Sequence, residues 1–331
     1  MKDKFTIGIC GLGSIGLQHA RAVVNLKGFD IVGYDTVPET ALSEDLPLSA
    51  FYNDWDSFLN HPMDGVILAS PTEYHAAQAK AFLKRRIALL IEKPMAQDRA
   101  SALEIRDLAL KNEVPVLVGY SLRHSSLFMR AKELLDQGSI GELVSFHLHL
   151  GAYETLTLAA NRFNQKVYGR LFGDYSHEWD YLRWFSEQAV KRVNALASTV
   201  ESIDRVEAPN CINALLQLDN GVSGTLHLDY IQKPGGRSCF LSGTEGTLKL
   251  DTATAQIDFI DREGEHETFA LTEERNVIYQ RQLKHFTQVI VGEVPPTCNV
   301  HDGLAAVQIA DALLDSSREN GWIEVNAPPS K

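Results

Sequence analysis

The segment Gly11-Leu12-Gly13-Ser14-Ile15-Gly16 decides the fold of this chain. An apolar run over residues 5–10 precedes it and is expected to form a buried strand, and a helical pattern over residues 15–26 follows it. Glycines spaced G-x-G-x-x-G at a strand-to-helix junction allow a tight turn, close approach of the backbone to a pyrophosphate, and close packing of the helix on the strand. The phosphates then lie at the positive N-terminal end of the helix. The segment therefore predicts a dinucleotide-binding turn, in which Leu12, Ser14 and Ile15 lie along the cofactor with the glycines.

An acidic residue at the end of the next strand indicates which dinucleotide is bound. The apolar run over residues 31–34 ends at Asp35, nineteen residues after Gly16. Dinucleotide folds place there the carboxylate that bonds the ribose hydroxyls of the adenosine. Thr36, Val37 and Pro38 follow, so no Arg or Lys is available to receive a 2′-phosphate. The sequence predicts NAD as the cofactor rather than NADP.

The first 120 residues alternate apolar runs with helical segments. Strands are expected over residues 65–70, 88–91 and 114–119, and helices over 75–85 and 100–112. Alternation of helices with unbroken apolar strands is typical of a doubly wound parallel sheet. We therefore predict an α/β, Rossmann-type domain over residues 1–121.

After Tyr120 the alternation of strands and helices gives way to consecutive strands. A helix over residues 127–137 leads into a long strand over 143–150. Residues 211–218 and 222–230, joined by Asn220-Gly221, have the pattern of a hairpin, and further short strands follow to residue 261. We predict a second, α+β domain over residues 122–331, with a large, mostly antiparallel sheet that binds substrate and supports assembly into a homodimer or homotetramer.

Composition excludes several classes of function. A net charge of −12 in 331 residues argues against a nucleic-acid partner. No apolar run reaches the length of about 18 residues that a membrane span requires, and the N-terminus leads straight into the first strand, so we expect a cytoplasmic protein. The four cysteines show no paired spacing, and His147 and His149 share a strand face without further ligands. We predict no metal site.

Glu92-Lys93-Pro94 follows the strand expected over residues 88–91 directly. The carboxyl ends of parallel strands are where open α/β sheets bind ligands, and the proline restricts Lys93 to extended backbone geometry. Lys93 could therefore meet both nicotinamide and substrate. Taken alone, the segment fits a surface loop that carries a salt bridge better than an active-site loop.

Several motifs, in this order and spacing, resemble the Gfo/Idh/MocA family (glucose–fructose oxidoreductase and inositol dehydrogenase). These are the three glycines and Asp35, Ser70-Pro71-Thr72-x-x-His75, Glu92-Lys93-Pro94, Gly119-Tyr120-Ser121-x-Arg123, Gly138-x-Ile140-Gly141 and His177-x-x-Asp180-x-x-x-Trp184. The resemblance implies hydride transfer to or from a sugar, a polyol or a sugar derivative, with the nicotinamide held between the domains. It implies that Lys93 lies in the active site and that Ser70, Pro71, Thr72, His75 and Glu92 lie along the cofactor. The family often has Asn where this chain has Ser121, so a nicotinamide contact at Ser121 is open.

A third group of candidate catalytic residues surrounds His177. If a helix begins near Gly173, then Asp174, His177 and Asp180 share one face of it. Histidine titrates near neutrality and can accept the hydroxyl proton while hydride leaves the same carbon. Many family members place the catalytic acid four residues before the histidine, and that position is Gly173 here. Asp174 is therefore either an active-site acid or a helix cap.

Lys93, Asp174 and His177 are thus the candidate catalytic residues, and all three are also candidate substrate ligands. Softer candidates for the substrate site are Arg123 and Tyr153, together with His124, Arg170 and Arg237. The leading hypothesis is an NAD-dependent dehydrogenase acting on a secondary hydroxyl. The alternatives are a lyase or hydrolase that oxidises a glycoside transiently, and a regulator that binds NAD without catalysis.

Overall fold

Two of the central strands of the first sheet are buried along their whole length. The computed structural model describes residues 4–24, 26–37, 46, 48–153, 169–199 and 209–325. Within these ranges, β4 (Gly65–Leu68) and β5 (Ala88–Ile91) contain only buried residues. Such continuously apolar strands fit a sheet that is covered by helices on both faces.

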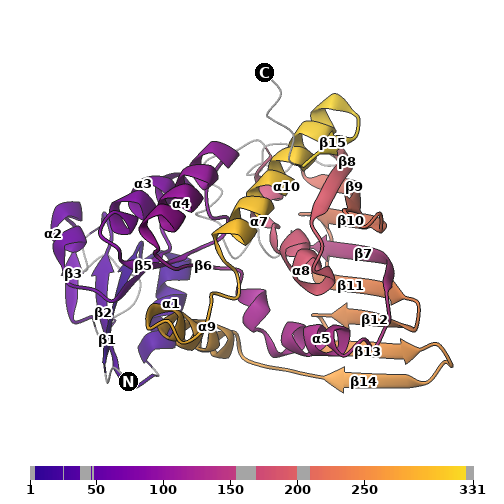
Figure 1. The fold of residues 1–331 in the computed structure, drawn as a ribbon, viewed down its shortest axis with the longest axis horizontal. Coiled ribbons are helices and arrows are strands. Elements are labelled where there is room, and N and C mark those ends of the chain that lie inside the picture. Colours follow the sequence, from indigo (N-terminus) through magenta and orange to yellow (C-terminus); the bar gives the residue numbers. More distant parts are fainter. Residues whose placement is uncertain are drawn as a thin grey trace. The chain divides into compact units, whose positions relative to one another are not determined.

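The first sheet is parallel and has six strands in the order β3-β2-β1-β4-β5-β6. Helices α3 and α4 pack together, α1 and α9 pack together, and Figure 1 shows these two pairs on opposite sides of the sheet. This confirms the predicted doubly wound sheet. Its remaining elements are β1 (Phe5–Cys10), α1 (Ser14–Val24), β2 (Phe29–Tyr34), β3 (Ala50–Tyr52), α2 (Trp55–Asn60), α3 (Thr72–Leu83), α4 (Arg99–Asn112), β6 (Val116–Val118), the 3₁₀ turn η2 (Ser121–His124) and α9 (Arg275–Ile290).

The second sheet has nine strands in the order β14-β13-β12-β11-β7-β10-β9-β8-β15. All neighbouring pairs are antiparallel except β7 and β10, so the predicted mostly antiparallel sheet is confirmed. The strands are β7 (Leu143–Gly151), β8 (Val190–Ser198), β9 (Cys211–Leu218), β10 (Ser223–Asp229), β11 (Gly236–Gly243), β12 (Gly246–Asp251), β13 (Gln256–Asp261), β14 (His266–Ala270) and β15 (Ile323–Glu324).

Residues alternate between the two faces of this second sheet. In β9 every second residue from Ile212 to Leu218 is buried, whereas Asn213 and Leu215 are exposed and Gln217 is half-buried. The helices α5 (Ser126–Asp136) and α8 (His177–Ser186) lie against one face (Figure 1). Among the described residues, Asn213 and Leu215 of β9 are exposed on the other face, which we call the open face. The predicted hairpin is present, since β9 and β10 pair antiparallel around Gly221, whose φ is +91°.

The chain forms two compact units and returns once to the first of them. One unit contains residues 1–124 and 273–307, and the other contains residues 125–272 and 308–331. Helix α9 belongs to the first unit, and α10 (Val300–Glu319) runs across the last boundary, between residues 307 and 308. The predicted division into residues 1–121 and 122–331 lacks this return. No local sequence pattern in residues 273–307 indicates that they pack with the first unit.

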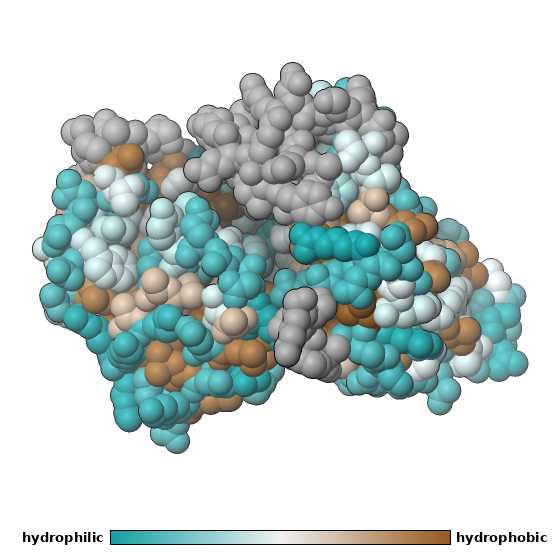
Figure 2. Space-filling model, turned by 90° about the horizontal axis from the view of Figure 1, so that it is seen from above, coloured by the Kyte–Doolittle hydropathy of each residue, from teal (hydrophilic) through white to brown (hydrophobic). Residues whose placement is uncertain are grey.

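One predicted helix is interrupted. The segment expected to form a single helix from Gly173 consists of α7 (Arg170–Asp174) and α8, with Tyr175 and Ser176 between them. The expectation that Asp174, His177 and Asp180 share one helix face is therefore wrong. Among the described residues no helix is long and apolar enough to cross a membrane. On the face seen in Figure 2, hydrophilic residues separate small groups of hydrophobic ones.

Candidate functional site

The glycine loop follows β1 at the carboxyl edge of the first sheet. The strand order reverses between β1 and β4, which pair in parallel, and such a reversal is the binding crevice of doubly wound folds. A Cβ atom at Gly11, whose φ is +89°, would lie 2.6 Å from the backbone nitrogen of Ser70. A Cβ atom at Gly16 would lie 1.8 Å from the carbonyl oxygen of Gly11, whereas one at Gly13 would meet nothing within 4 Å. Gly11 and Gly16 thus shape the turn, and Gly13 leaves room for a pyrophosphate.

Asp35 is hydrogen-bonded to this loop. Its Oδ2 accepts a hydrogen bond of 2.7 Å from the backbone N–H of Leu12, and its Oδ1 accepts one of 3.1 Å from the N–H of Val37. Leu12 is buried, while Ser14, the first residue of α1, is exposed and Ile15 is half-buried. Each carboxylate oxygen keeps a second lone pair, which suits it to accept from a ribose diol. The chain's own residues therefore fit the adenosine half of NAD.

Replacing Asp35 with Asn is expected to weaken NAD binding by about 10- to 100-fold, because a hydrogen bond to a charged group contributes about 1.5–3 kcal/mol. The same change removes the charge that repels a 2′-phosphate, so the affinity for NADP should rise relative to that for NAD. Titration of both cofactors by fluorescence measures the ratio. Asp56→Asn on α2 is a matched control, and equal loss of both affinities would contradict this role for Asp35.

The turn after β4 and the first turn of α3 contain four predicted cofactor ligands. Ser70 donates from its hydroxyl to Gln78 (2.6 Å), Pro71 is exposed, and Thr72 begins α3. His75 is 1% exposed, with Nε2 2.9 Å from the carbonyl oxygen of Ser70 and Nδ1 3.1 Å from that of Pro94. Burial lowers the pKa of His75 against the opposing effect of these carbonyls. The ring of His75 thus lies inside the first unit and contacts the backbone.

Glu92 and Lys93 follow β5 at the same edge of the sheet. Glu92 is buried, and its Oε1 lies 2.7 Å from Nε2 of His19 on α1. Its Oε2 accepts from the backbone N–H of Lys93 at 3.2 Å. Lys93 is half-buried, and its peptide bond to Pro94 is cis. Glu92 therefore bonds to residues of its own unit, and Lys93 stands at the carboxyl edge with its backbone held.

The 3₁₀ turn η2 contains two further predicted site residues. Ser121 bonds to the phenol of Tyr279 on α9; burial raises the pKa of that phenol, and the bond from Ser121 opposes the rise. Arg123 is buried, donates to the carbonyl oxygen of Thr297 at 2.5 Å and lies 3.5 Å from Asp302. The guanidinium group that was predicted to contact substrate therefore contacts residues 297 and 302 of its own unit.

In the second unit, Asp174 and His177 lie on either side of the break between α7 and α8. Asp174 is buried and accepts a hydrogen bond of 2.8 Å from the phenol of Tyr230, which is itself fully buried. His177 is the first residue of α8 and is half-buried. The residue that precedes α8 as its N-cap is Ser176, whose side chain makes no capping hydrogen bond.

The softer candidates of the second unit also have partners within it. Nε of Arg237 lies 2.5 Å from Glu178, and burial opposes the positive charge of Arg237 while Glu178 raises its pKa. The ammonium group of Lys233 lies 3.6 Å from the centre of the Tyr153 ring. The side chain of Arg170 lies outside the described residues.

Two buried residues that contact candidate site residues were not anticipated from the sequence: His19, which contacts Glu92, and Tyr230, which contacts Asp174. His19 lies three residues after Gly16 on the buried side of α1, and Tyr230 directly follows β10. The spacing of His19 from the glycine loop is a local signal that could have been followed. Nothing near Tyr230 points to Asp174, because their contact joins positions 56 residues apart.

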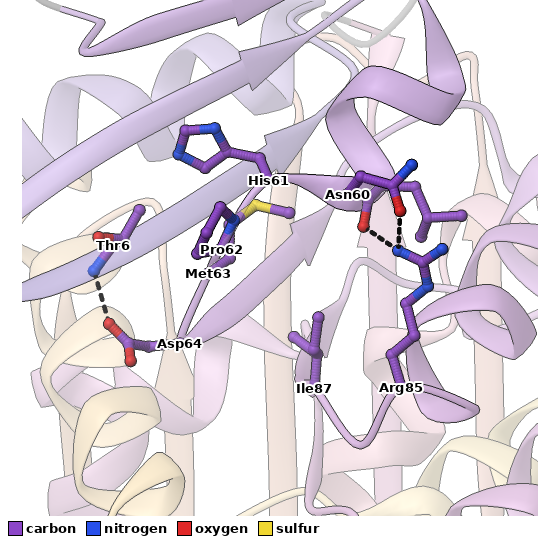
Figure 3. Close-up of a pocket in the computed structure, with 9 residues that line it drawn as sticks. Thr6, Asn60, His61, Pro62, Met63, Asp64, Arg85 and Ile87 are labelled. Carbon is purple, nitrogen blue, oxygen red and sulfur yellow. Dashed lines mark hydrogen bonds between the residues drawn. The ribbon is translucent and has the colours of Figure 1, made fainter.

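Figure 3 shows a pocket of about 370 Å³ at the opposite edge of the first sheet. Thr6 lies near the start of β1, and Asp64 and Ile87 precede β4 and β5. On one side the N–H of Thr6 donates to Asp64 (2.8 Å), and on the other Arg85 bonds to Asn60 (3.0 Å). This pocket lies at the amino ends of the strands, so it is not the dinucleotide site.

Comparison with known families identifies both halves of the chain. Residues 5–120 match the profile described as oxidoreductase family, NAD-binding Rossmann fold, and residues 128–249 match that of the GFO/IDH/MocA C-terminal domain. No group of three or more His, Cys, Asp or Glu residues in the described part of the chain is arranged to hold a metal ion.

Several individual relatives are distant in sequence and span nearly the whole chain. The inositol 2-dehydrogenase of Salmonella typhimurium is 24% identical over 338 aligned positions, which cover 98% of this chain and 97% of the relative. A scyllo-inositol dehydrogenase from Lactobacillus casei, solved with NAD(H) and scyllo-inositol, has a TM-score of 0.83 at 20% identity and covers 98% of this chain and all of its own. A levoglucosan dehydrogenase solved with NADH and L-sorbose has a TM-score of 0.87 at 18% identity, with 97% and 99% of the two chains covered.

Proposed function

The chain belongs to the GFO/IDH/MocA family of NAD-binding oxidoreductases, and we propose that it is a dehydrogenase for a cyclic polyol or a sugar. In this proposal hydride passes between a secondary hydroxyl of the substrate, or the corresponding ketone, and the nicotinamide. Relatives named for inositol and levoglucosan support this substrate class. The observation that carries the proposal is the place of Lys93, which follows a fully buried strand at the carboxyl edge that also holds the glycine loop.

In this mechanism Lys93 and His177 have different roles toward the substrate hydroxyl. NAD, when bound, supplies the hydride acceptor. The ammonium group of Lys93 donates a hydrogen bond to the substrate oxygen and stabilises the negative charge that develops on it. The imidazole of His177 accepts the hydroxyl proton, and Asp174, held by the phenol of Tyr230, supplies a carboxylate in the same unit. In the direction of reduction, His177 returns the proton to the new hydroxyl.

A screen of purified protein with NAD against inositols, sugars and sugar acids tests this function. We expect net formation of NADH with at least one cyclic substrate, and we expect it to fall by about 10²–10⁴-fold in His177→Gln, which lacks a titrating ring. His301→Gln, on the exposed side of α10, is a matched control.

Two results of this screen would overturn the proposal. Product that forms without net NADH would indicate transient oxidation followed by elimination or hydrolysis of a glycoside. Binding of NAD without turnover of any substrate would indicate a regulator.

We further propose that the protein acts in the cytoplasm as a homodimer or homotetramer. All four cysteines are free thiols, which suits a reducing compartment. The open face of the nine-stranded sheet carries four exposed apolar side chains, and pairing between copies would bury them: Leu196, Leu215, Phe240 and Ile260.

A further inference from the structure

A buried histidine contacts the residue that precedes Lys93. His19 is 1% exposed, and its Nε2 lies 2.7 Å from Oε1 of Glu92. The ring of Tyr279 on α9 meets the ring of His19 edge-on, with 4.9 Å between their centres. A Cβ atom at Gly119 would lie 2.9 Å from the carboxyl carbon of Glu92, so the backbone of residue 119 closes the other side. The carboxyl group of Glu92 is thus fixed between α1, α9 and the end of β6.

A second buried histidine contacts the residue that follows Lys93. Nδ1 of His75 lies 3.1 Å from the carbonyl oxygen of Pro94, and its Nε2 lies 2.9 Å from that of Ser70. A neutral imidazole has a single N–H and can donate to one of these oxygens at a time. Since burial lowers the pKa of His75, the neutral ring is favoured, and it spans the end of β4 and the residue after Lys93.

We propose that His19 and His75 are positioning residues that clamp the Glu92-Lys93-Pro94 segment from its two sides. The inference rests on the proposed role of Lys93. His19 holds Glu92, whose other oxygen accepts from the backbone N–H of Lys93 at 3.2 Å, and His75, with its proton on Nδ1, donates to the carbonyl of Pro94. Both clamping residues come from helices that follow cofactor-edge strands, so the position of Lys93 is tied to the loops that carry NAD.

The physical reason for such a clamp is the sensitivity of hydride transfer to distance. Lys93 has a long side chain with several rotatable bonds, so the position of its backbone limits where its ammonium group can lie. A displacement of about 1 Å of a catalytic group can cost about 10²-fold in rate. Hydrogen bonds made in a buried site are stronger than exposed ones and are costly to leave unpaired. Buried histidines on both sides therefore hold the segment more firmly than surface contacts could.

Substitution of each histidine by Leu, compared with substitution by an amide of matching geometry, tests the clamp. His19→Gln retains an N–H donor at nearly the position of the imidazole Nε2, His75→Asn retains one at nearly the position of Nδ1, and Leu removes every donor. We expect His19→Leu and His75→Leu to lower kcat by up to about 100-fold while the Kd for NAD changes little, and we expect the amide variants to restore most of the loss. Hydrogen exchange of residues 92–96 should accelerate in the Leu variants and remain slow in the amide variants. His61→Leu, whose ring bonds Tyr52 at the amino edge of the sheet, is the matched control.

The exchange measurement separates this inference from the proposed function, because it needs no substrate. Slow exchange over residues 92–96 in both Leu variants, with unchanged kcat, would overturn the clamp even if Lys93 proves essential. Accelerated exchange in the Leu variants, with slow exchange in His19→Gln and His75→Asn, would support the clamp, even if no polyol were turned over and the proposed function failed.

Discussion

Replacing Lys93 with Met is expected to lower kcat by about 10²–10⁴-fold and to leave the affinity for NAD nearly unchanged. Met has a similar length and apolar stem but cannot donate a hydrogen bond to the substrate oxygen. The half-buried segment that carries residue 93 is held through Glu92 and Pro94, so its backbone should keep its place in the variant. Steady-state kinetics with the best substrate of the screen, together with titration of NAD, measures the two effects separately.

Lys111→Met provides the control for this experiment. Lys111 lies exposed in the last turn of α4, and its replacement should leave kcat unchanged. Full activity of Lys93→Met would remove Lys93 from the mechanism. A loss of NAD binding equal to the loss of kcat would instead assign Lys93 to cofactor binding.

Two glycine substitutions in the loop are expected to separate folding from cofactor binding. An added methyl at Gly16 would lie 1.8 Å from a backbone carbonyl that cannot move freely, so Gly16→Ala should lower the apparent Tm by roughly 5–10 °C and abolish binding. An added methyl at Gly13 meets no protein atom within 4 Å. Gly13→Ala should therefore keep the Tm of the free protein and yet weaken NAD binding by about 100-fold, because the methyl occupies the space of the pyrophosphate.

Calorimetry with and without NAD measures both variants of this pair. The free wild-type protein and Gly321→Ala, at a glycine with open surroundings near the C-terminus, serve as references. Unchanged NAD affinity in Gly13→Ala would show that the phosphates do not approach the loop at this residue. A normal Tm in Gly16→Ala would show that the contact with Gly11 can relax.

The structure bears out the sequence analysis most closely where local pattern and topology coincide. The apolar strands β4 and β5, the glycine loop and the carboxylate of Asp35 each belong to a strand–helix–strand unit of neighbouring residues. Their places at the carboxyl edge follow from the parallel order of the strands. The hairpin of β9 and β10 followed from its turn residues in the same way.

The sequence did not anticipate partners that are distant in the chain. Glu92 and Arg123 were assigned to cofactor and substrate, yet the structure pairs Glu92 with His19 and Arg123 with Thr297 and Asp302. Asp174 was weighed as an active-site acid or a helix cap, and the structure pairs it with Tyr230. A charged residue in a motif looks the same in sequence whether it faces a ligand or a buried partner, because the partner is supplied by another part of the chain.

The sequence by itself determined the doubly wound sheet, the NAD-binding loop and the segment that carries Lys93, since each depends on residues within a few positions of one another. Only the tertiary structure decided that the chain returns to the first unit through α9, and that His19 contacts Glu92 while His75 contacts the carbonyl of Pro94. The physical reason is that a hydrogen bond across 73 residues, as between His19 and Glu92, forms only after the sheet has brought its helices together. Local propensity cannot encode that contact, and packing selects it.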